Sequence, residues 1–159
     1  IVIMMTPVIL SVFGLFPSPY IHRPTPQITT MDMHGMEWSF DKKDRDIQYV
    51  HTMSVPYRFA DAILGKDERA QRSDIQRYAP FVPDHFNYPE KIYFGENYSS
   101  DKYLVLTKLD KIVYITVYKP VGRFNEADFI RLEDDPSVQS LYSNGECNVH
   151  YIDGLFNGI

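Results

Sequence analysis

The sequence predicts an α/β fold, a small sandwich with a mixed sheet that ends in a β-hairpin and follows a truncated transmembrane helix. Short apolar runs typical of strands alternate with segments typical of helices, and Asn144-Gly145, a strong hairpin signal, lies between the last two strand-like runs. Strands that alternate with helices and then form an antiparallel hairpin favour a mixed sheet. An α+β arrangement is the alternative.

The chain begins with an apolar segment, since residues 1–16 are almost wholly apolar and no charge occurs before His22 and Arg23. A helix rises about 1.5 Å per residue and must cross roughly 30 Å of hydrocarbon, which takes about 20 apolar residues. We therefore expect residues 1–16 to be the C-terminal part of a transmembrane helix in the lipid bilayer. A signal sequence would have a basic start and a small-residue cleavage site, and a buried core helix would need protein on every side.

Residues 17–27 are rich in proline, which predicts an extended connector, and residues 28–159 have the size of one domain. Only Arg23 lies within ten residues of the apolar segment, so no basic cluster holds this end in the cytoplasm. Asn97-Tyr98-Ser99 matches the N-glycosylation pattern. Together these features predict a cell-membrane protein whose soluble part is extracytoplasmic.

The composition indicates a globular domain, because 44% of the residues are hydrophobic and 23% are charged. The net charge is −5 without a block of Lys and Arg, which argues against nucleic acid as a partner. Cys147 is the only cysteine, so an intrachain disulfide cannot form. The sequence contains no G-x-G-x-x-G, P-loop or G-x-S-x-G motif, and we expect no cofactor and no serine nucleophile.

The first expected helix covers Met31–Lys43, with Thr29 or Thr30 as its N-cap. Its apolar residues fall on two sides, with Trp38 and Met31 opposite a stripe formed by Met33, Met36 and Phe40. A helix that is apolar on two sides is expected to lie between two layers, or between the sheet and a membrane.

The middle of the chain is predicted to hold one strand and one short helix. Ile47–Met53 is the expected strand, and the helix runs from Pro56 through Leu64 and is closed by Gly65. Lys66–Arg77 is polar and charged, typical of a helix or a loop. Tyr78–Ser100 contains three prolines and several aromatic residues and is expected to be a long ordered loop.

The second half carries the clearer signals. Tyr103–Thr107 is a continuous apolar run, typical of a buried strand, whereas Lys111–Tyr118 fits either a strand or a helix. Asn125 is expected to cap a helix over Asn125–Glu133. Val138–Ser143 and Glu146–Ile152 are the expected strands of the hairpin.

Several short motifs resemble those of one family, the C-terminal tails of archaeal polytopic membrane proteins described as glycosyltransferase-like, with a membrane core of the GT-C class. These motifs are Phe16-Pro-Ser-Pro-Tyr20, Gly35-Met-Glu-Trp38, Tyr57-Arg-Phe-Ala-Asp61, Asp135-Pro-Ser-Val138 and Tyr142-Ser-Asn-Gly-Glu146. The resemblance implies a parent protein that transfers sugar from a lipid-phosphate donor on the outer face of the membrane. It places the catalytic acids in an early loop upstream of this chain, so no catalytic residue is expected here.

The segment from Tyr57 to Asp61 is the first candidate ligand site. It follows a predicted strand at the start of a helix, where α/β folds position ligand groups and backbone N–H groups attract anions. Arg58 and Asp61 are three residues apart and can form an ion pair on one helix face. An ion pair is the structural interpretation, and contact of Tyr57, Arg58 and Asp61 with a sugar or phosphate is the functional one.

Asp84 and His85, in the aromatic loop, are the second candidate ligand site, with loop hydrogen bonding as the structural alternative. His34 and Glu37 are three apart on the first helix, and Glu37 is four from Asp41, a pattern explained by a solvated helix face. The five histidines show no metal-ligand spacing, so no metal site is expected. Asp134-Asp135 is interpreted as a turn that ends a helix.

From sequence we therefore expect a non-catalytic extracytoplasmic domain of a polytopic, glycosyltransferase-like membrane protein, accessory to lipid-linked sugar transfer. Its expected partners are the bilayer, the upstream membrane domain of the same protein, and a glycan or lipid-linked sugar. The alternative is a membrane-anchored cell-surface binding module without an enzymatic role.

Overall fold

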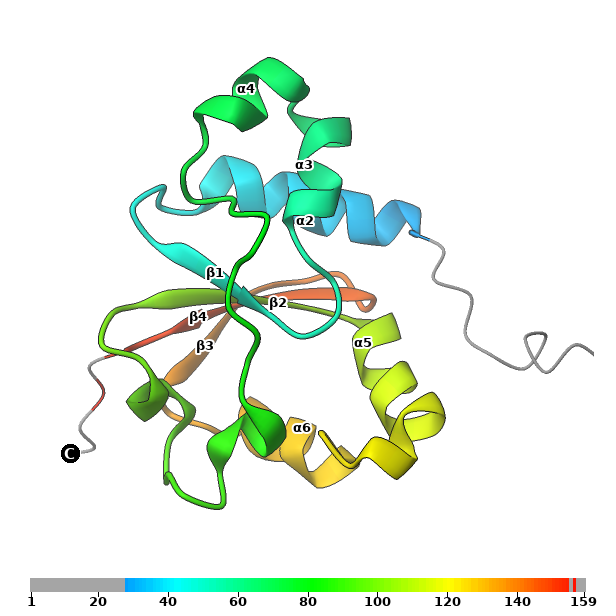
Figure 1. The fold of residues 1–159 in the computed structure, drawn as a ribbon, viewed down its shortest axis with the longest axis vertical. Coiled ribbons are helices and arrows are strands. Elements are labelled where there is room, and N and C mark those ends of the chain that lie inside the picture. The colour runs from blue at the N-terminus through cyan, green and yellow to red at the C-terminus, as the bar shows by residue number, and fades with distance from the viewer. Residues whose placement is uncertain (1–27, 155, 157–159) are drawn as a thin grey trace, which may run out of the picture.

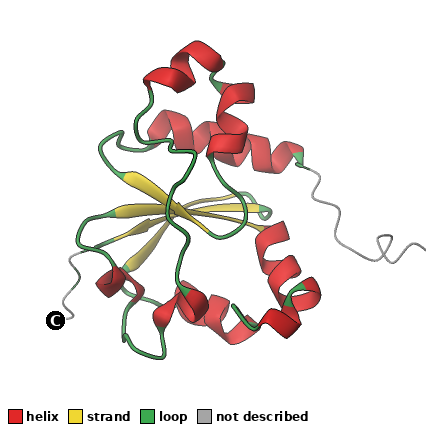
Figure 2. Ribbon diagram, in the orientation of Figure 1, coloured by secondary structure: helices red, strands yellow, loops and turns green. Residues whose placement is uncertain are grey.

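A computed structural model describes residues 28–154 and 156, and its centre is a four-stranded mixed sheet (Figures 1 and 2). The strands are β1 (Gln48–His51), β2 (Lys102–Thr107), β3 (Val138–Ser143) and β4 (Cys147–Ile152), in the spatial order β1-β2-β4-β3. Strands β1 and β2 are parallel, and β4 pairs antiparallel with both β2 and β3. The predicted α/β class, mixed sheet and C-terminal hairpin are confirmed.

The predicted membrane segment 1–16 and connector 17–27 lie outside the described residues. Within the part of the chain that the structure describes, no helix has the length and apolar character needed to cross a membrane.

One face of the sheet is covered by α2 (Thr30–Lys42), with α3 (Tyr57–Ile63) and α4 (Lys66–Gln71) on the same side (Figure 1). Thr29 is the N-cap of α2, because its hydroxyl accepts from the Asp32 amide at 3.0 Å and its amide donates to the Asp32 carboxylate at 3.0 Å. The predicted helix is therefore confirmed to within one residue at each end. Gly65 ends α3, as predicted, because it follows the C-cap residue Leu64 with a φ of +78°, and α4 begins at the next residue.

The opposite face is covered by α5 (Lys108–Ile112), a π-helical turn (Val113–Val117) and α6 (Glu126–Glu133). The segment 111–118, which fitted either structure in sequence, is helical. The predicted strand Ile47–Met53 is shorter than expected, because β1 covers only Gln48–His51. The predicted loop Tyr78–Ser100 contains two 3-10 turns, η2 (Asp84–Asn87) and η3 (Phe94–Asn97). A third 3-10 turn, η5 (Lys119–Val121), follows the π-helical turn.

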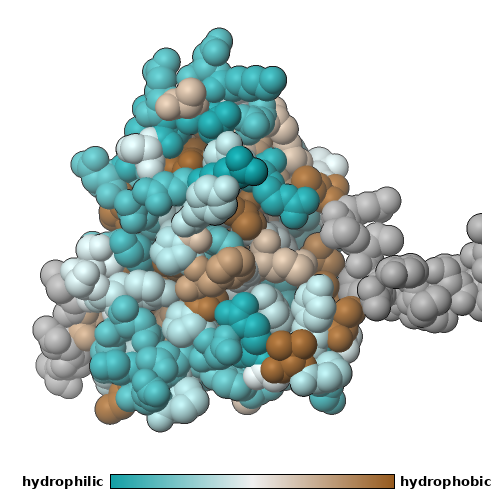
Figure 3. All heavy atoms as spheres, in the orientation of Figure 1, coloured by the Kyte–Doolittle hydropathy of each residue, from teal (hydrophilic) through white to brown (hydrophobic). Residues whose placement is uncertain are grey.

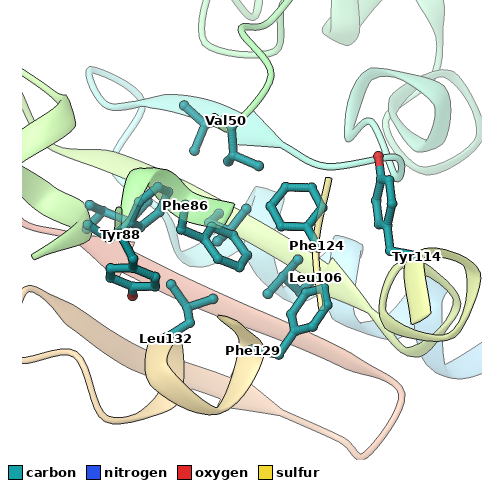
Figure 4. Close-up of a cluster of buried hydrophobic side chains, with 12 residues drawn as sticks. Val50, Phe86, Tyr88, Leu106, Tyr114, Phe124, Phe129 and Leu132 are labelled. Atoms are coloured by element: carbon teal, nitrogen blue, oxygen red, sulfur yellow. The ribbon is translucent and has the colours of Figure 1, made fainter. Parts of the chain in front are cut away.

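Each face of the sheet carries its own hydrophobic core. Leu104 and Leu106 of β2 point into a core centred on Phe86, which contacts the rings of Phe94, Phe124 and Phe129 (Figure 4). Tyr103 and Val105, which alternate with the leucines, point into the core beneath α2. Burial on both faces explains why β2 is a continuous apolar run instead of an alternating one.

Helix α2 lies unusually close to β4. A Cβ atom on Gly35 would lie 2.4 Å from the Cys147 Sγ, so any larger residue forces the helix or the strand to move. Close packing against Cys147 therefore explains why position 35 is a glycine, without reference to a ligand.

A buried ionic cluster links α2 to the segment after α4. Asp74 accepts two hydrogen bonds from the Arg72 guanidinium at 2.8 Å, and Lys43 Nζ lies 2.9 Å from the same carboxylate. All three side chains are almost fully buried. Burial opposes ionisation of Asp74, but the bonds from Arg72 and Lys43 outweigh it and hold the pKa of that carboxyl below its ordinary value. Lys43 also donates to the Asp44 and Ile47 carbonyls, so this cluster closes the turn between α2 and β1.

His150 of β4 is a buried titratable group whose charged form the fold disfavours. Burial, and secondarily the nearby Lys111 charge, lowers the pKa of His150 to about 4 from an ordinary 6.5. Between these two values the unfolded chain holds a proton that the folded chain does not. The contribution of His150 to the free energy of unfolding is therefore fully present above about pH 6.5, and it is lost as the pH drops toward 4.

We predict that His150→Gln removes part of this acid sensitivity. The loss of unfolding free energy between pH 7 and pH 4 should be about 2–3 kcal/mol smaller in the variant than in the unaltered chain. Urea unfolding at a series of pH values measures this difference, with the exposed His34→Gln as a control that leaves the pH dependence unchanged. An identical pH dependence in His150→Gln and the unaltered chain would contradict the prediction.

Candidate functional site

A small cavity lies where the parallel strands β1 and β2 end. Its volume is about 100 Å³. The walls come from the start of α2, the segment after β1, the first turn of α3 and the segment after β2. The polar residues that line it are Asp32, Ser54, Arg58 and Thr107, and the apolar ones are Ile28, Met53, Val55, Phe59 and Leu109. The carboxyl edge of parallel strands is where open α/β sheets bind ligands, so this cavity is the candidate site.

Arg58 is the cation of the cavity, and its side chain is exposed. The possible ion pair between Arg58 and Asp61 is not formed. Asp61 instead accepts a hydrogen bond from Arg69 Nε at 2.8 Å, and the Arg69 guanidinium lies over the Tyr57 ring. Within residues 28–154 the structure gives no hydrogen bond or ion pair to the Arg58 side chain. Of the three candidates in this segment, only Arg58 lines the cavity, whereas Tyr57 and Asp61 contact Arg69.

Asp110, just beyond the cavity wall, holds the ends of both parallel strands. Its Oδ1 accepts from the amides of Met53 and Ser54 at 3.2 and 2.8 Å. Its Oδ2 accepts from the amide and hydroxyl of Thr107 at 2.7 and 3.0 Å. Burial raises the pKa of Asp110, and the hydrogen bonds from Thr107 and Ser54 act against that rise. One carboxylate therefore connects the chain that leaves β1 to the chain that leaves β2.

Asp32 places a carboxylate in the wall of the same cavity. Its Oδ2 is engaged by the Thr29 amide at 3.0 Å as part of the α2 capping box. The cavity thus combines one guanidinium without a described partner and one carboxylate that already accepts a backbone hydrogen bond. A negatively charged ligand group in this cavity would be attracted to the Arg58 guanidinium.

Asp84 and His85 lie in a left-handed turn away from the cavity. His85, Phe86 and Asn87 have φ values of 52°, 51° and 60°, a conformation that costs a non-glycine residue roughly 1–2 kcal/mol. His85 Nδ1 lies 2.7 Å from Asp128 Oδ2, and Asp84 pairs with Arg123. These contacts hold the turn while Phe86 fills the core. Asp84 and His85 therefore take part in contacts that stabilise this turn, and neither residue lines the Arg58 cavity.

A larger hollow, which we call the α2 groove, lies between α2, α3, α4 and β3 and has a volume of about 530 Å³. Five residues of α2 line it, and four of them, His34, Glu37, Trp38 and Asp41, have the spacing i, i+3, i+4, i+7. The other residues that line it are Phe40 of α2, Arg45, Ile63, Leu64, Glu68 and Tyr142. In the sequence, His34, Glu37 and Asp41 are interpreted as a solvated helix face. Their helical spacing is visible in the sequence. The surfaces that face them across the groove belong to α4 and β3, which lie far along the chain and could not be predicted from that spacing.

Asp135 has a structural role, in line with the turn predicted at Asp134-Asp135. Its carboxylate accepts from the Tyr88 hydroxyl at 2.9 Å, the Phe94 amide at 2.7 Å, and both the amide and the hydroxyl of Ser137. Among residues 28–154 and 156, no group of three or more His, Cys, Asp or Glu side chains is placed to hold a metal ion.

The exposed surface adds no further candidate on the face shown in Figure 3. Hydrophilic residues cover the α4 end of this face, and hydrophobic residues form small separate patches. Scattered exposed apolar residues are normal on globular proteins.

We predict that Asp110→Asn destabilises the fold by about 3 kcal/mol, because the amide group offers one acceptor where four donors converge. Chemical denaturation measures the change, and it should appear as a lower urea midpoint with an unchanged slope. The exposed Asp46→Asn serves as the matched control and should leave the midpoint in place. Equal midpoints for the two variants would show that Asp110 does not hold the strand ends.

No protein family model, no curated protein and no solved structure matches this chain.

Proposed function

We propose that this chain is a non-catalytic extracytoplasmic domain of a polytopic membrane protein, accessory to lipid-linked sugar transfer, and that Arg58 binds the phosphate of the lipid-linked ligand. The observation that carries the proposal is the Arg58 cavity at the carboxyl edge of β1 and β2. The resemblance to glycosyltransferase-like membrane proteins supports the choice of ligand class.

The chemistry of the cavity favours an anionic group. A guanidinium presents its N–H donors in a planar fork that matches the oxygens of a phosphate. Pockets that enclose whole drug-sized ligands measure about 300–1,000 Å³. A cavity of about 100 Å³ therefore fits a single charged group, while the rest of the ligand stays outside.

The position of the cavity favours a ligand that is anchored in the membrane by its lipid chain. Ile28, the first described residue, lines the cavity, so the chain reaches it directly from the connector 17–27. If residues 17–27 adopt the extended conformation that their prolines predict, at about 3.1 Å per residue, they span roughly 34 Å. If residues 1–16 lie in the bilayer, Arg58 stays within reach of a lipid phosphate.

A membrane-anchored cell-surface binding module without an enzymatic role is the second candidate. The exposed, polar α2 groove favours it, because a surface module needs a binding face that does not depend on the membrane. The two candidates differ in the effect of Arg58. An accessory domain needs Arg58 for sugar transfer by the parent protein, whereas a surface module does not.

We predict that Arg58→Ala weakens binding of a prenyl phosphate by about 10-fold, since it removes a charge-assisted contact worth about 1.5 kcal/mol. Arg58→Lys should bind with intermediate strength, because it keeps the charge and loses the planar fork. The measurement is a titration of the full chain in detergent micelles with farnesyl phosphate, followed by amide chemical shifts. Farnesol is the uncharged control ligand.

The control variant is Arg77→Ala, which removes an exposed arginine outside the cavity and should leave the affinity unchanged. Equal affinities for Arg58→Ala and the unaltered chain, or equal binding of farnesol and farnesyl phosphate, would exclude phosphate binding at Arg58. In the parent protein, Arg58→Ala should raise the KM for the lipid-linked donor and leave kcat unchanged. An unchanged KM would favour the surface module.

A further inference from the structure

We infer that the α2 groove is a binding site for a neutral saccharide. This site is separate from the Arg58 cavity. It shares with the proposed function the expectation of a sugar ligand, but it is argued from the side chains of the groove alone.

The floor of the groove holds a pair of stacked aromatic rings. The centroids of Trp38 and Tyr142 lie 4.9 Å apart with an angle of 22° between the ring planes, and both side chains are half-buried. Aromatic rings of this kind offer a large apolar surface together with a polar edge. The apolar C–H face of a pyranose ring is a suitable partner for such a surface, because its hydroxyl groups stay free to bond at the rim.

The aromatic pair is held in place before any ligand binds. Asn144 Nδ2 donates to the Met31 carbonyl at 2.7 Å and to the Tyr142 hydroxyl at 3.3 Å, which ties the hairpin to α2. The absence of a side chain on Gly35 lets α2 approach β4 closely enough for this contact. A site whose rings are already positioned loses less entropy on binding.

The polar groups of the groove combine acceptors and donors. Glu37 and Glu68 supply carboxylate acceptors from α2 and α4, and Arg45 supplies donors. Within residues 28–154 the structure shows no hydrogen bond or ion pair to these three side chains, while Asp41 already contacts Lys42. A sugar hydroxyl both donates and accepts, so it can use the carboxylates and the guanidinium together.

An organic cation is the competing ligand, because Glu37 and Glu68 outnumber Arg45 even with Asp41 paired to Lys42, and the groove is therefore net acidic. Arg45, however, adds N–H donors that a cation cannot use and a sugar hydroxyl can. The volume of about 530 Å³ lies in the range of sites that enclose a small organic molecule and suits one or two sugar rings. The mixed donors and acceptors and the aromatic pair therefore favour a neutral mono- or disaccharide.

The test uses Trp38 as its own reporter, because it is the only tryptophan of the chain. The full chain is titrated with maltose, cellobiose and lactose while tryptophan emission is recorded. We expect a saturable change in emission with at least one of the three sugars. Saturation-transfer NMR, which detects the sugar, provides the readout for variants that lack the tryptophan.

Trp38→Ala and Glu37→Ala should each raise the Kd for that sugar at least ~10-fold, a loss of about 1.4 kcal/mol. Trp38→Phe and Glu37→Gln should bind nearly as well as the unaltered chain, because they keep the ring and the acceptor oxygen. Glu90→Ala, an exposed acid outside the groove, is the matched control and should not change the Kd. Circular dichroism of each variant confirms that it is folded.

Three results would overturn the inference. The first is no saturable signal up to ~50 mM sugar, far above the millimolar Kd of a weak site. The second is an unchanged Kd in both folded alanine variants. The third is saturable binding of spermidine in the groove where neutral sugars fail, which would assign the site to a cation. None of these results involves Arg58, so the phosphate proposal stands or falls separately.

Discussion

Burial of β2 on both faces is the constraint on which the rest of this structure depends. Because β2 contributes side chains to two cores, each face of the sheet must be covered by helices, α2 and α3 on one side and α5 and α6 on the other. Parallel pairing of β1 with β2 needs a long connection between them, and the chain from α3 through η3 supplies it. The antiparallel pairing of β4 then closes the sheet with the C-terminal hairpin.

Polar side chains stabilise the places where this arrangement leaves backbone groups without partners. Asp110 satisfies amides at the ends of both parallel strands, and Asp135 satisfies those where η3 meets the turn before β3. The buried cluster at Asp74 closes the turn from α2 into β1. Buried carboxylates with such bonds are structural. Arg58 and three polar residues of the α2 groove, Glu37, Arg45 and Glu68, differ from them, because their side chains are exposed and have no hydrogen-bond or ion-pair partner among the described residues.

Local signals predicted the elements well and the sites only in part. The capping residues Thr29 and Asn125 and the Asn144-Gly145 turn act within a few residues, so the sequence alone located α2, α6 and the hairpin. The same local reasoning placed Arg58 at a strand-to-helix junction, where the structure has a cavity. It also suggested a pairing of Arg58 with Asp61, because the competing contact from Arg69 depends on how α4 folds back against α3.

The sequence by itself determined the α/β class, the boundaries of α2 and α6 and the hairpin, since capping, periodicity and turn chemistry depend on neighbouring residues. Only the tertiary structure decided which polar residues are free to meet a ligand. Glu37 and Trp38 look like an ordinary helix surface until β3 brings Tyr142 against them, more than 100 residues later. Asp84 and His85 likewise meet their partners, Arg123 and Asp128, only in the folded chain. Such contacts form between segments distant in the chain, and no local pattern records them.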